Sequence, residues 1–63
     1  MYTCTEHSNI SAALKDAAQT SADLNTICFV TFDKETESFF ASSNIAVEST
    51  ETILATFKNG VQQ

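Results

Sequence analysis

Between residues 9 and 22 the apolar positions recur three or four residues apart, which is the spacing of one face of a helix. Most of these positions are alanine, so the helix can approach its neighbour closely. Ser8 or Asn9 can cap its first turn by accepting a backbone N–H bond. We predict an amphipathic helix from Asn9 to Ala22. Its apolar stripe consists of Ile10, Ala13, Leu14, Ala17, Ala18 and Ser21.

Two apolar segments, 26–33 and 38–47, flank a polar run and predict an antiparallel hairpin. The first segment is apolar on both faces, with Cys28, Val30 and Phe32 on one and Ile27 and Phe29 on the other. Strands of that kind are usually buried on both faces. In the second segment alternate residues from Phe39 to Val47 form the better core face, and Phe40 points the opposite way.

The polar run from Asp33 to Ser38 predicts the hairpin turn. The Asp33 carboxylate can accept a backbone N–H two residues further on. No glycine stands where such loops commonly close, so the pattern leaves the turn type open.

The C-terminal part predicts a second helix, from Thr50 to Asn59. Ser49 is a suitable N-cap, and Lys58 suits the negative end of the helix dipole. Gly60 stands where a left-handed residue ends many helices. Ile53, Leu54 and Phe57 would form the apolar stripe of this helix.

The first seven residues are compatible with a short strand or with a frayed arm, since Tyr2 and Cys4 alternate with Thr3 and Thr5. The chain of 63 residues is too short for two cores, and we expect one α+β domain over residues 1–63. The expected order is α-β-β-α, a hairpin packed by two helices. If the N-terminal segment pairs, the order becomes β-α-β-β-α.

Eight acidic residues against three basic ones give a net charge of −5. This balance argues against direct binding to nucleic acid or to an anionic membrane, because both bind through attraction to lysine and arginine. It is compatible with a protein partner that has a basic surface. There is no apolar run of membrane-spanning length and no signal-peptide pattern, so we expect a cytoplasmic protein, in the host cytoplasm if phage-encoded.

The soft metal ligands in the chain are Cys4, His7 and Cys28, which do not form the paired spacing of a structural zinc site. We therefore expect no metal and no other cofactor. Two cysteines do not make a disulfide framework. A Cys4–Cys28 bridge stays open as an alternative to two reduced thiols.

No residue pattern points to catalysis. Cys28 falls in an apolar strand, where burial makes a thiol inert, and Cys4 and His7 lie in the least defined segment. Glu35 and Glu37 lie in the polar turn, where water keeps carboxyl groups at their ordinary acidity. With one glycine in the chain, a phosphate-binding loop cannot be built. We predict that the protein is not an enzyme and has no catalytic residues.

Six aromatic side chains exceed what so thin a core needs. Phe29 and Phe40, which fall on the second face of the hairpin, are the best candidates for an interface, with Tyr2 as a third. The hairpin also leaves two free edges to which an identical chain can add. We expect a homodimer or a larger homo-oligomer.

The resulting hypothesis is a small acidic interaction protein of the accessory-inhibitor type found in phages and mobile elements, which binds and occludes a macromolecular partner. Glu35 and Glu37 would contact a basic surface. The alternative is an oligomer that binds or sequesters a nucleotide or metabolite at a subunit interface. In that case Ser42, Ser43 and Asn44 would supply hydrogen bonds. A structural subunit of a larger assembly is a third hypothesis.

Overall fold

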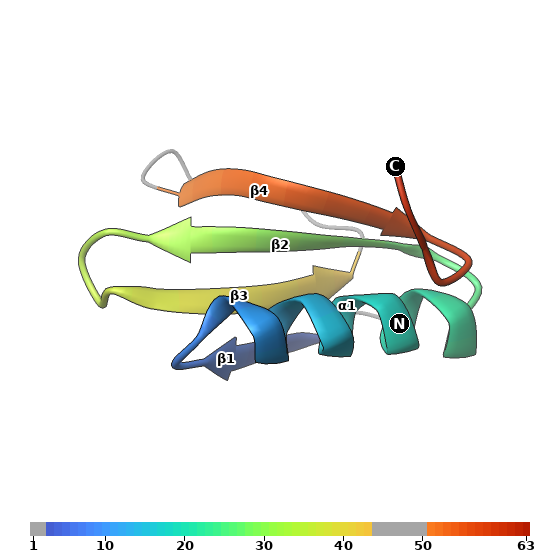
Figure 1. The fold of residues 1–63 in the computed structure, drawn as a ribbon, viewed down its shortest axis with the longest axis horizontal. Coiled ribbons are helices and arrows are strands. Elements are labelled where there is room, and N and C mark those ends of the chain that lie inside the picture. The colour runs from blue at the N-terminus through green and yellow to red at the C-terminus, as the bar shows by residue number, and fades with distance from the viewer. Residues whose placement is uncertain (1–2, 44–50) are drawn as a thin grey trace.

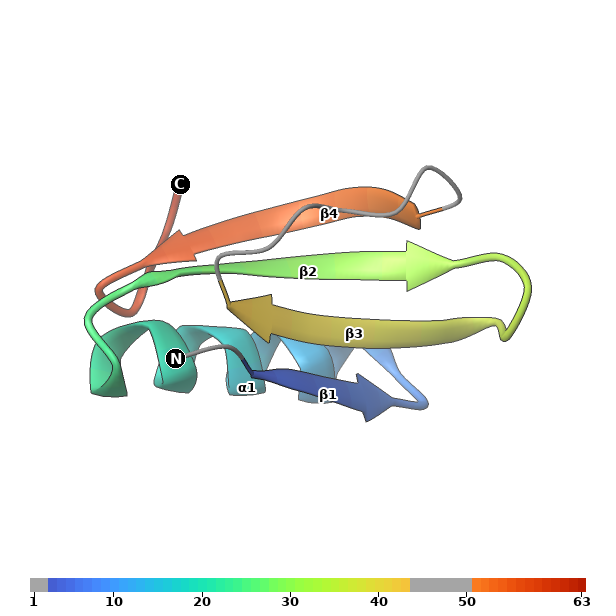
Figure 2. The ribbon, with the colours of Figure 1, turned by 180° about the vertical axis from the view of Figure 1, so that it is seen from behind.

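The structure, a computed structural model, describes residues 3–43 and 51–63. One helix packs on a five-stranded antiparallel sheet whose strand order is β1-β3-β2-β4-β5 (Figure 1; Figure 2 shows the sheet from behind). The α+β class is confirmed, but the expectation of two helices is wrong. The elements are β1 Cys4–His7, α1 Ile10–Asp23, β2 Ile27–Asp33, β3 Ser38–Ser43, β4 Glu51–Lys58 and β5 Val61–Gln62.

Helix α1 forms where its apolar spacing predicts it, within one residue at each end. Asn9 is the N-cap, and its side-chain oxygen accepts the backbone N–H of Ala12 at 2.9 Å. The helix ends where Leu24 N–H donates to the carbonyl of Thr20 and Asn25 adopts a left-handed φ of 51°. Asparagine tolerates that conformation better than most residues.

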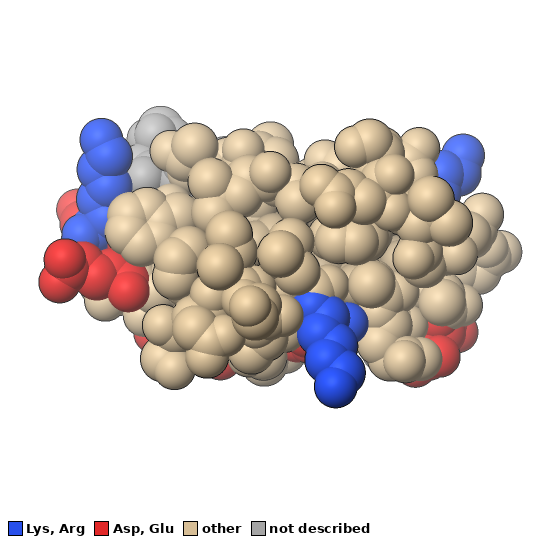
Figure 3. Space-filling model, in the orientation of Figure 1, with Lys and Arg blue, Asp and Glu red and all other residues tan. Residues whose placement is uncertain are grey.

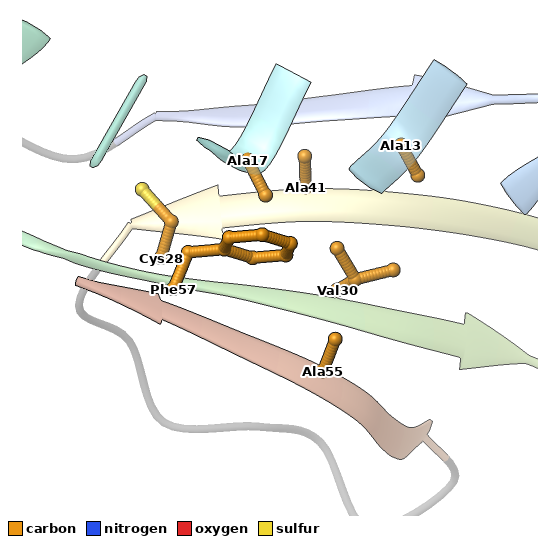
Figure 4. Close-up of a cluster of buried hydrophobic side chains, with 7 residues drawn as sticks. All are labelled: Ala13, Ala17, Cys28, Val30, Ala41, Ala55 and Phe57. Carbon is orange, nitrogen blue, oxygen red and sulfur yellow. The ribbon is translucent and has the colours of Figure 1, made fainter. Parts of the chain in front are cut away.

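The core lies between α1 and the sheet and is built from small side chains (Figure 4). Phe57 is the largest member of the cluster and Val30 the next. Because α1 contributes alanines, its axis can lie close to the strands, over β2, β3 and β4. The buried cluster consists of Ala13, Ala17, Cys28, Val30, Ala41, Ala55 and Phe57.

The β2–β3 hairpin confirms the predicted turn. Asp33 pairs with Ser38, and the Asp33 carboxylate accepts the backbone N–H of Glu35 at 2.9 Å. Glu37 takes the left-handed conformation, with φ 53°, in place of the missing glycine. β3 ends at Ser43, and residues 44–47 of the predicted second strand lie outside the described residues.

The predicted C-terminal helix is wrong, because Glu51–Lys58 form strand β4. β4 pairs with β2 at seven positions and so supplies the second neighbour that an apolar central strand needs. Its β-branched residues Thr52, Ile53 and Thr56 favour a strand. Asn59 and Gly60, with φ values of 52° and 82°, form the two-residue turn between Lys58 and Val61. This dipeptide is a strong hairpin signal and not a helix stop. The predicted cap, Ser49, lies outside the described residues.

Gly60 docks the β4–β5 turn on the end of α1. Its backbone N–H donates to the Ser21 hydroxyl at 2.8 Å, and that hydroxyl donates to the carbonyl of Ala18 at 2.9 Å. A Cβ atom on residue 60 would stand 3.3 Å from the Cβ of Ala22. The left-handed φ and this close approach both favour glycine.

We expect Gly60→Ala to lower the free energy of unfolding by about 1–2 kcal/mol, because alanine is strained at positive φ. Asn59→Gly, in the same turn, is the matched control and should change stability by less than about 0.5 kcal/mol. Urea unfolding followed by circular dichroism measures both. Equal effects of the two substitutions would contradict this account of the turn.

The N-terminal segment forms the edge strand β1, antiparallel to β3. Before β1, Thr3 exchanges backbone and side-chain hydrogen bonds with Ser43: Thr3 N–H donates to the Ser43 hydroxyl at 2.8 Å, and Ser43 N–H donates to the Thr3 carbonyl at 2.9 Å. The strand alternative for this segment is therefore the correct one.

Candidate interaction face

The sheet has a second face, opposite α1, which we call the outer face. Cys28 and Val30 point to the helix, so their neighbours along β2 point away from it. Cross-strand partners share a face, and the pairing therefore fixes the rest of the set. Figure 2 views this face, and no helix among the described residues covers it. Its members are Cys4, Glu6, Ile27, Phe29, Thr31, Asp33, Ser38, Phe40, Ser42, Ile53, Thr56, Lys58 and Val61.

Both aromatic residues predicted to form an interface lie on the outer face. Phe29 pairs with Ser42, and Phe40 pairs with Thr31, so the two rings belong to adjacent strands at diagonal positions. Both are half-buried. Ile53, on the other side of Thr31, is 49 % exposed. These three side chains, Phe29, Phe40 and Ile53, form what we call the apolar patch. Tyr2, the third predicted interface residue, lies outside the described residues.

The side chains between the patch residues are polar and buried. Thr31 and Ser42 are each 1 % exposed, although both belong to the outer face. The Ser42 hydroxyl donates to the sulfur of Cys4 at 3.4 Å. No buried side-chain nitrogen or oxygen in the described part of the chain lacks a hydrogen-bond partner. The apolar patch therefore lies over buried polar side chains whose hydrogen-bonding groups have partners.

The residues predicted for small-ligand binding are separated by the sheet. Ser42 belongs to the outer face, whereas Ser43 pairs with Cys28 and belongs to the helix side. Ser43 is fully buried and accepts a hydrogen bond from Thr3. Asn44 lies outside the described residues. The two serines thus do not converge on one site.

Charged groups gather at the ends of the molecule. Asp33, Glu35 and Glu37 lie at or in the β2–β3 turn together with one lysine, Lys34, and the backbone of Glu51 is the cross-strand partner of Asp33. Lys58 lies at the opposite end of the outer face, paired with Ile27. On the helix side, charged side chains occupy the ends and the lower rim and leave the middle uncharged (Figure 3). The predicted contacts Glu35 and Glu37 are exposed and lie at the acidic end.

Sequence reasoning missed a side-chain network that ties β1 to α1. The Nε2 atom of His7 lies 2.8 Å from an Asp16 carboxylate oxygen, and the Thr20 hydroxyl donates to the other oxygen at 3.1 Å. His7 and Asp16 are both partly exposed. The pattern carries no local signal for this pair, because it joins two elements through the fold. Its role is to hold the edge strand against the helix.

The two cysteines lie on opposite sides of the sheet and are both free. Cys4 belongs to the outer face and Cys28 to the core, so the alternative of a bridge between them is excluded. Among residues 3–43 and 51–63, no three His, Cys, Asp or Glu side chains come together as a metal site would require.

Burial, and to a lesser degree the negative charge of Asp16, raises the pKa of the Cys28 thiol above its ordinary value of 9.0. A raised pKa favours the neutral thiol in the folded state. This contribution to stability is complete below the unfolded pKa and is lost as pH rises through the folded pKa.

We expect the free energy of unfolding to fall as pH rises above about 9, because the unfolded Cys28 thiol ionises before the folded one. Urea unfolding at pH 8 and at pH 10 measures the loss. Cys28→Ala is the control, since the difference between wild type and variant isolates this thiol from other groups that titrate there. Parallel pH profiles for the two proteins would contradict the prediction.

No helix in the described ranges is long and apolar enough to cross a membrane. Comparisons of the chain with protein-family models, with curated proteins and with solved structures gave no match.

Proposed function

We propose that this chain is a non-enzymatic binding protein that docks its outer face on a macromolecular partner and occludes it. The observation that carries the proposal is the apolar patch, in which Phe29, Phe40 and Ile53 share a sheet face that no described helix covers. Aromatic side chains that become fully desolvated are the usual carriers of binding energy. The buried polar residues Thr31 and Ser42 beneath them hold these side chains on a rigid surface.

The charge distribution favours a partner whose apolar binding site adjoins a basic one. Asp33, Glu35 and Glu37 lie at the β2–β3 end of the sheet, next to the outer face, and outnumber the one lysine there, Lys34. The net charge of −5 adds a long-range attraction to basic surfaces. Such charges speed association and select partners, whereas the patch supplies the affinity. The acidity supports the more specific proposal of an accessory inhibitor of phage or mobile-element type.

The alternative of a nucleotide or metabolite binder receives less support. Ser42 and Ser43 lie on opposite faces of the sheet, and Ser43 already bonds to Thr3. We therefore retain macromolecular binding as the proposed function.

An affinity experiment with matched variants tests the proposal. The full chain is immobilised as wild type, as Phe40→Lys and as Ile10→Lys, which places the same charge on α1 of the opposite layer. We expect a partner that binds to wild type and to Ile10→Lys but not to Phe40→Lys. Its binding should weaken as the salt concentration rises. Equal binding to all three proteins would exclude the outer face as the binding surface. If none of the three proteins bound a partner, the proposed function would be contradicted.

A further inference from the structure

The turn between β4 and β5 brings together the reacting groups of a self-modification of the chain. Asn59 is exposed and is followed by Gly60, the one glycine of the sequence. The backbone nitrogen that follows an asparagine can attack the carbon of the asparagine side-chain amide. Glycine leaves that path open because it has no side chain, and asparagine is one of the thermolabile residues. The turn therefore places a reactive Asn-Gly pair at the surface.

The reaction needs water and no other reactant. The Gly60 nitrogen gives up its proton to the solvent and bonds to Cγ of Asn59. The bond from Cγ to the side-chain nitrogen breaks, and that nitrogen takes up a proton and leaves as ammonia. Water then opens the cyclic imide at either of its carbonyl groups. One opening gives aspartate, and the other gives isoaspartate, in which the main chain runs through the former side chain.

In the folded chain the Gly60 nitrogen is held back from this attack. Its N–H donates to the Ser21 hydroxyl at 2.8 Å, and that hydroxyl donates to the carbonyl of Ala18 at 2.9 Å. Ser21 is fully buried, so water does not replace it as the acceptor. The nitrogen must lose its proton before it attacks, and the bond to Ser21 therefore has to break first.

We propose that Asn59 is a site of spontaneous deamidation and that the Ser21 hydroxyl controls its rate, by holding the Gly60 N–H until the β4–β5 turn opens. β5 is two residues long and lies at the edge of the sheet, where local opening costs least. The product adds one negative charge to the net charge of −5. Isoaspartate also lengthens the main chain of a two-residue turn, so the pairing of Lys58 with Val61 is lost.

The chain contains a matched internal control for this reaction. Asn25 is exposed and left-handed, with φ 51° against 52° for Asn59. The N–H of the next residue, Thr26, also bonds to Ser21, but it donates to the carbonyl, at 3.1 Å. The two asparagines therefore differ in the residue that follows and in the group of Ser21 that holds its N–H. Threonine is β-branched and hinders the attack, whereas glycine does not.

Peptide mass spectrometry on the full chain, incubated in mildly alkaline buffer, measures both asparagines in one sample. We expect Asn59 to deamidate roughly tenfold or more faster in urea than in the folded state, because unfolding removes the restraint. Asn25 should stay slow in both conditions. Equal rates at Asn59 in the two conditions would overturn the proposal, and so would equal rates at the two asparagines in urea.

Ser21→Ala tests the role of the hydroxyl. The folded variant should deamidate at Asn59 about two- to tenfold faster than wild type, the factor expected for the loss of one hydrogen bond. Asn25 should not change, because the next N–H bonds to the carbonyl of residue 21, which alanine keeps. Ser11→Ala, at an exposed position of the same helix, is the matched control and should react as wild type does. An unchanged rate at Asn59 in Ser21→Ala, or equal acceleration at both asparagines, would overturn the proposal.

Hydrogen exchange keeps the test decisive if Ser21→Ala does not fold. Deamidation at Asn59 and exchange of the Gly60 amide require the same opening of the turn, so low urea concentrations should speed both by the same factor in wild type. A deamidation rate that rises independently of this exchange would overturn the proposal. None of these measurements involves a binding partner, so they stand or fail separately from the proposed function.

Discussion

Phe57→Ala should lower the free energy of unfolding by about 3–5 kcal/mol and leave a large share of the chain unfolded at room temperature. Phe57 is 6 % exposed and is the only large side chain in a buried cluster of alanines, one valine and one cysteine, as far as the described residues extend. The alanines of this cluster are too short to fill the space that the ring leaves. A domain of this size has a total stability of only about 3–9 kcal/mol.

Urea unfolding followed by far-ultraviolet circular dichroism measures this loss. Ile10→Ala is the control, because Ile10 is an exposed apolar residue at the start of α1 and should lose no more than about 1 kcal/mol. If the two variants lost equal stability, Phe57 would not be the centre of the core.

Ala17→Leu should also destabilise the fold strongly, by about 1–3 kcal/mol, through overpacking. Ala17 is fully buried, and Figure 4 shows it directed from α1 toward the ring of Phe57. Three additional carbons there must push the helix off the sheet or force strained rotamers. Intrinsic helix propensity cannot explain such a loss, since leucine is almost as good a helix former as alanine.

Ser11→Leu separates the two explanations, because Ser11 is exposed on the same helix. We expect its melting temperature to stay within a few degrees of wild type, while Ala17→Leu melts well below it. An unchanged melting temperature for Ala17→Leu would mean that the helix does not pack closely on the sheet.

The local parts of the fold could be predicted from the sequence, and the non-local parts could not. The alanine stripe and Asn9 specify α1, and Asp33 specifies its turn, because each signal acts within a few residues. Residues 51–58 carry apolar positions that fit a helix as well as a strand. The pairing with β2 decides between them, aided by the Asn59-Gly60 turn. That dipeptide was the available signal for the correct structure.

For the candidate interaction face, too, only the features with a local signal could be predicted from the sequence. Alternation along the strands placed Phe29 and Phe40 on the second face, and the register places them at diagonal positions on adjacent strands. The same alternation separates Ser42 from Ser43, so neighbours in sequence cannot share a site. The contribution of Ile53 could not be predicted, because it depends on the register shift that makes Leu54 the extra residue in β4.

The most direct test of the central claim, that the outer face is a surface for interaction and not a second core, is the stability of Phe40→Lys. On β1, Glu6 is the cross-strand partner of residue 40 and can pair with the new charge. The account predicts a folded protein with cooperative urea unfolding, less stable than wild type by no more than about 1.5 kcal/mol. A Phe40→Lys chain without a folded state would contradict it, because a lysine can abolish folding there only if Phe40 belongs to a core.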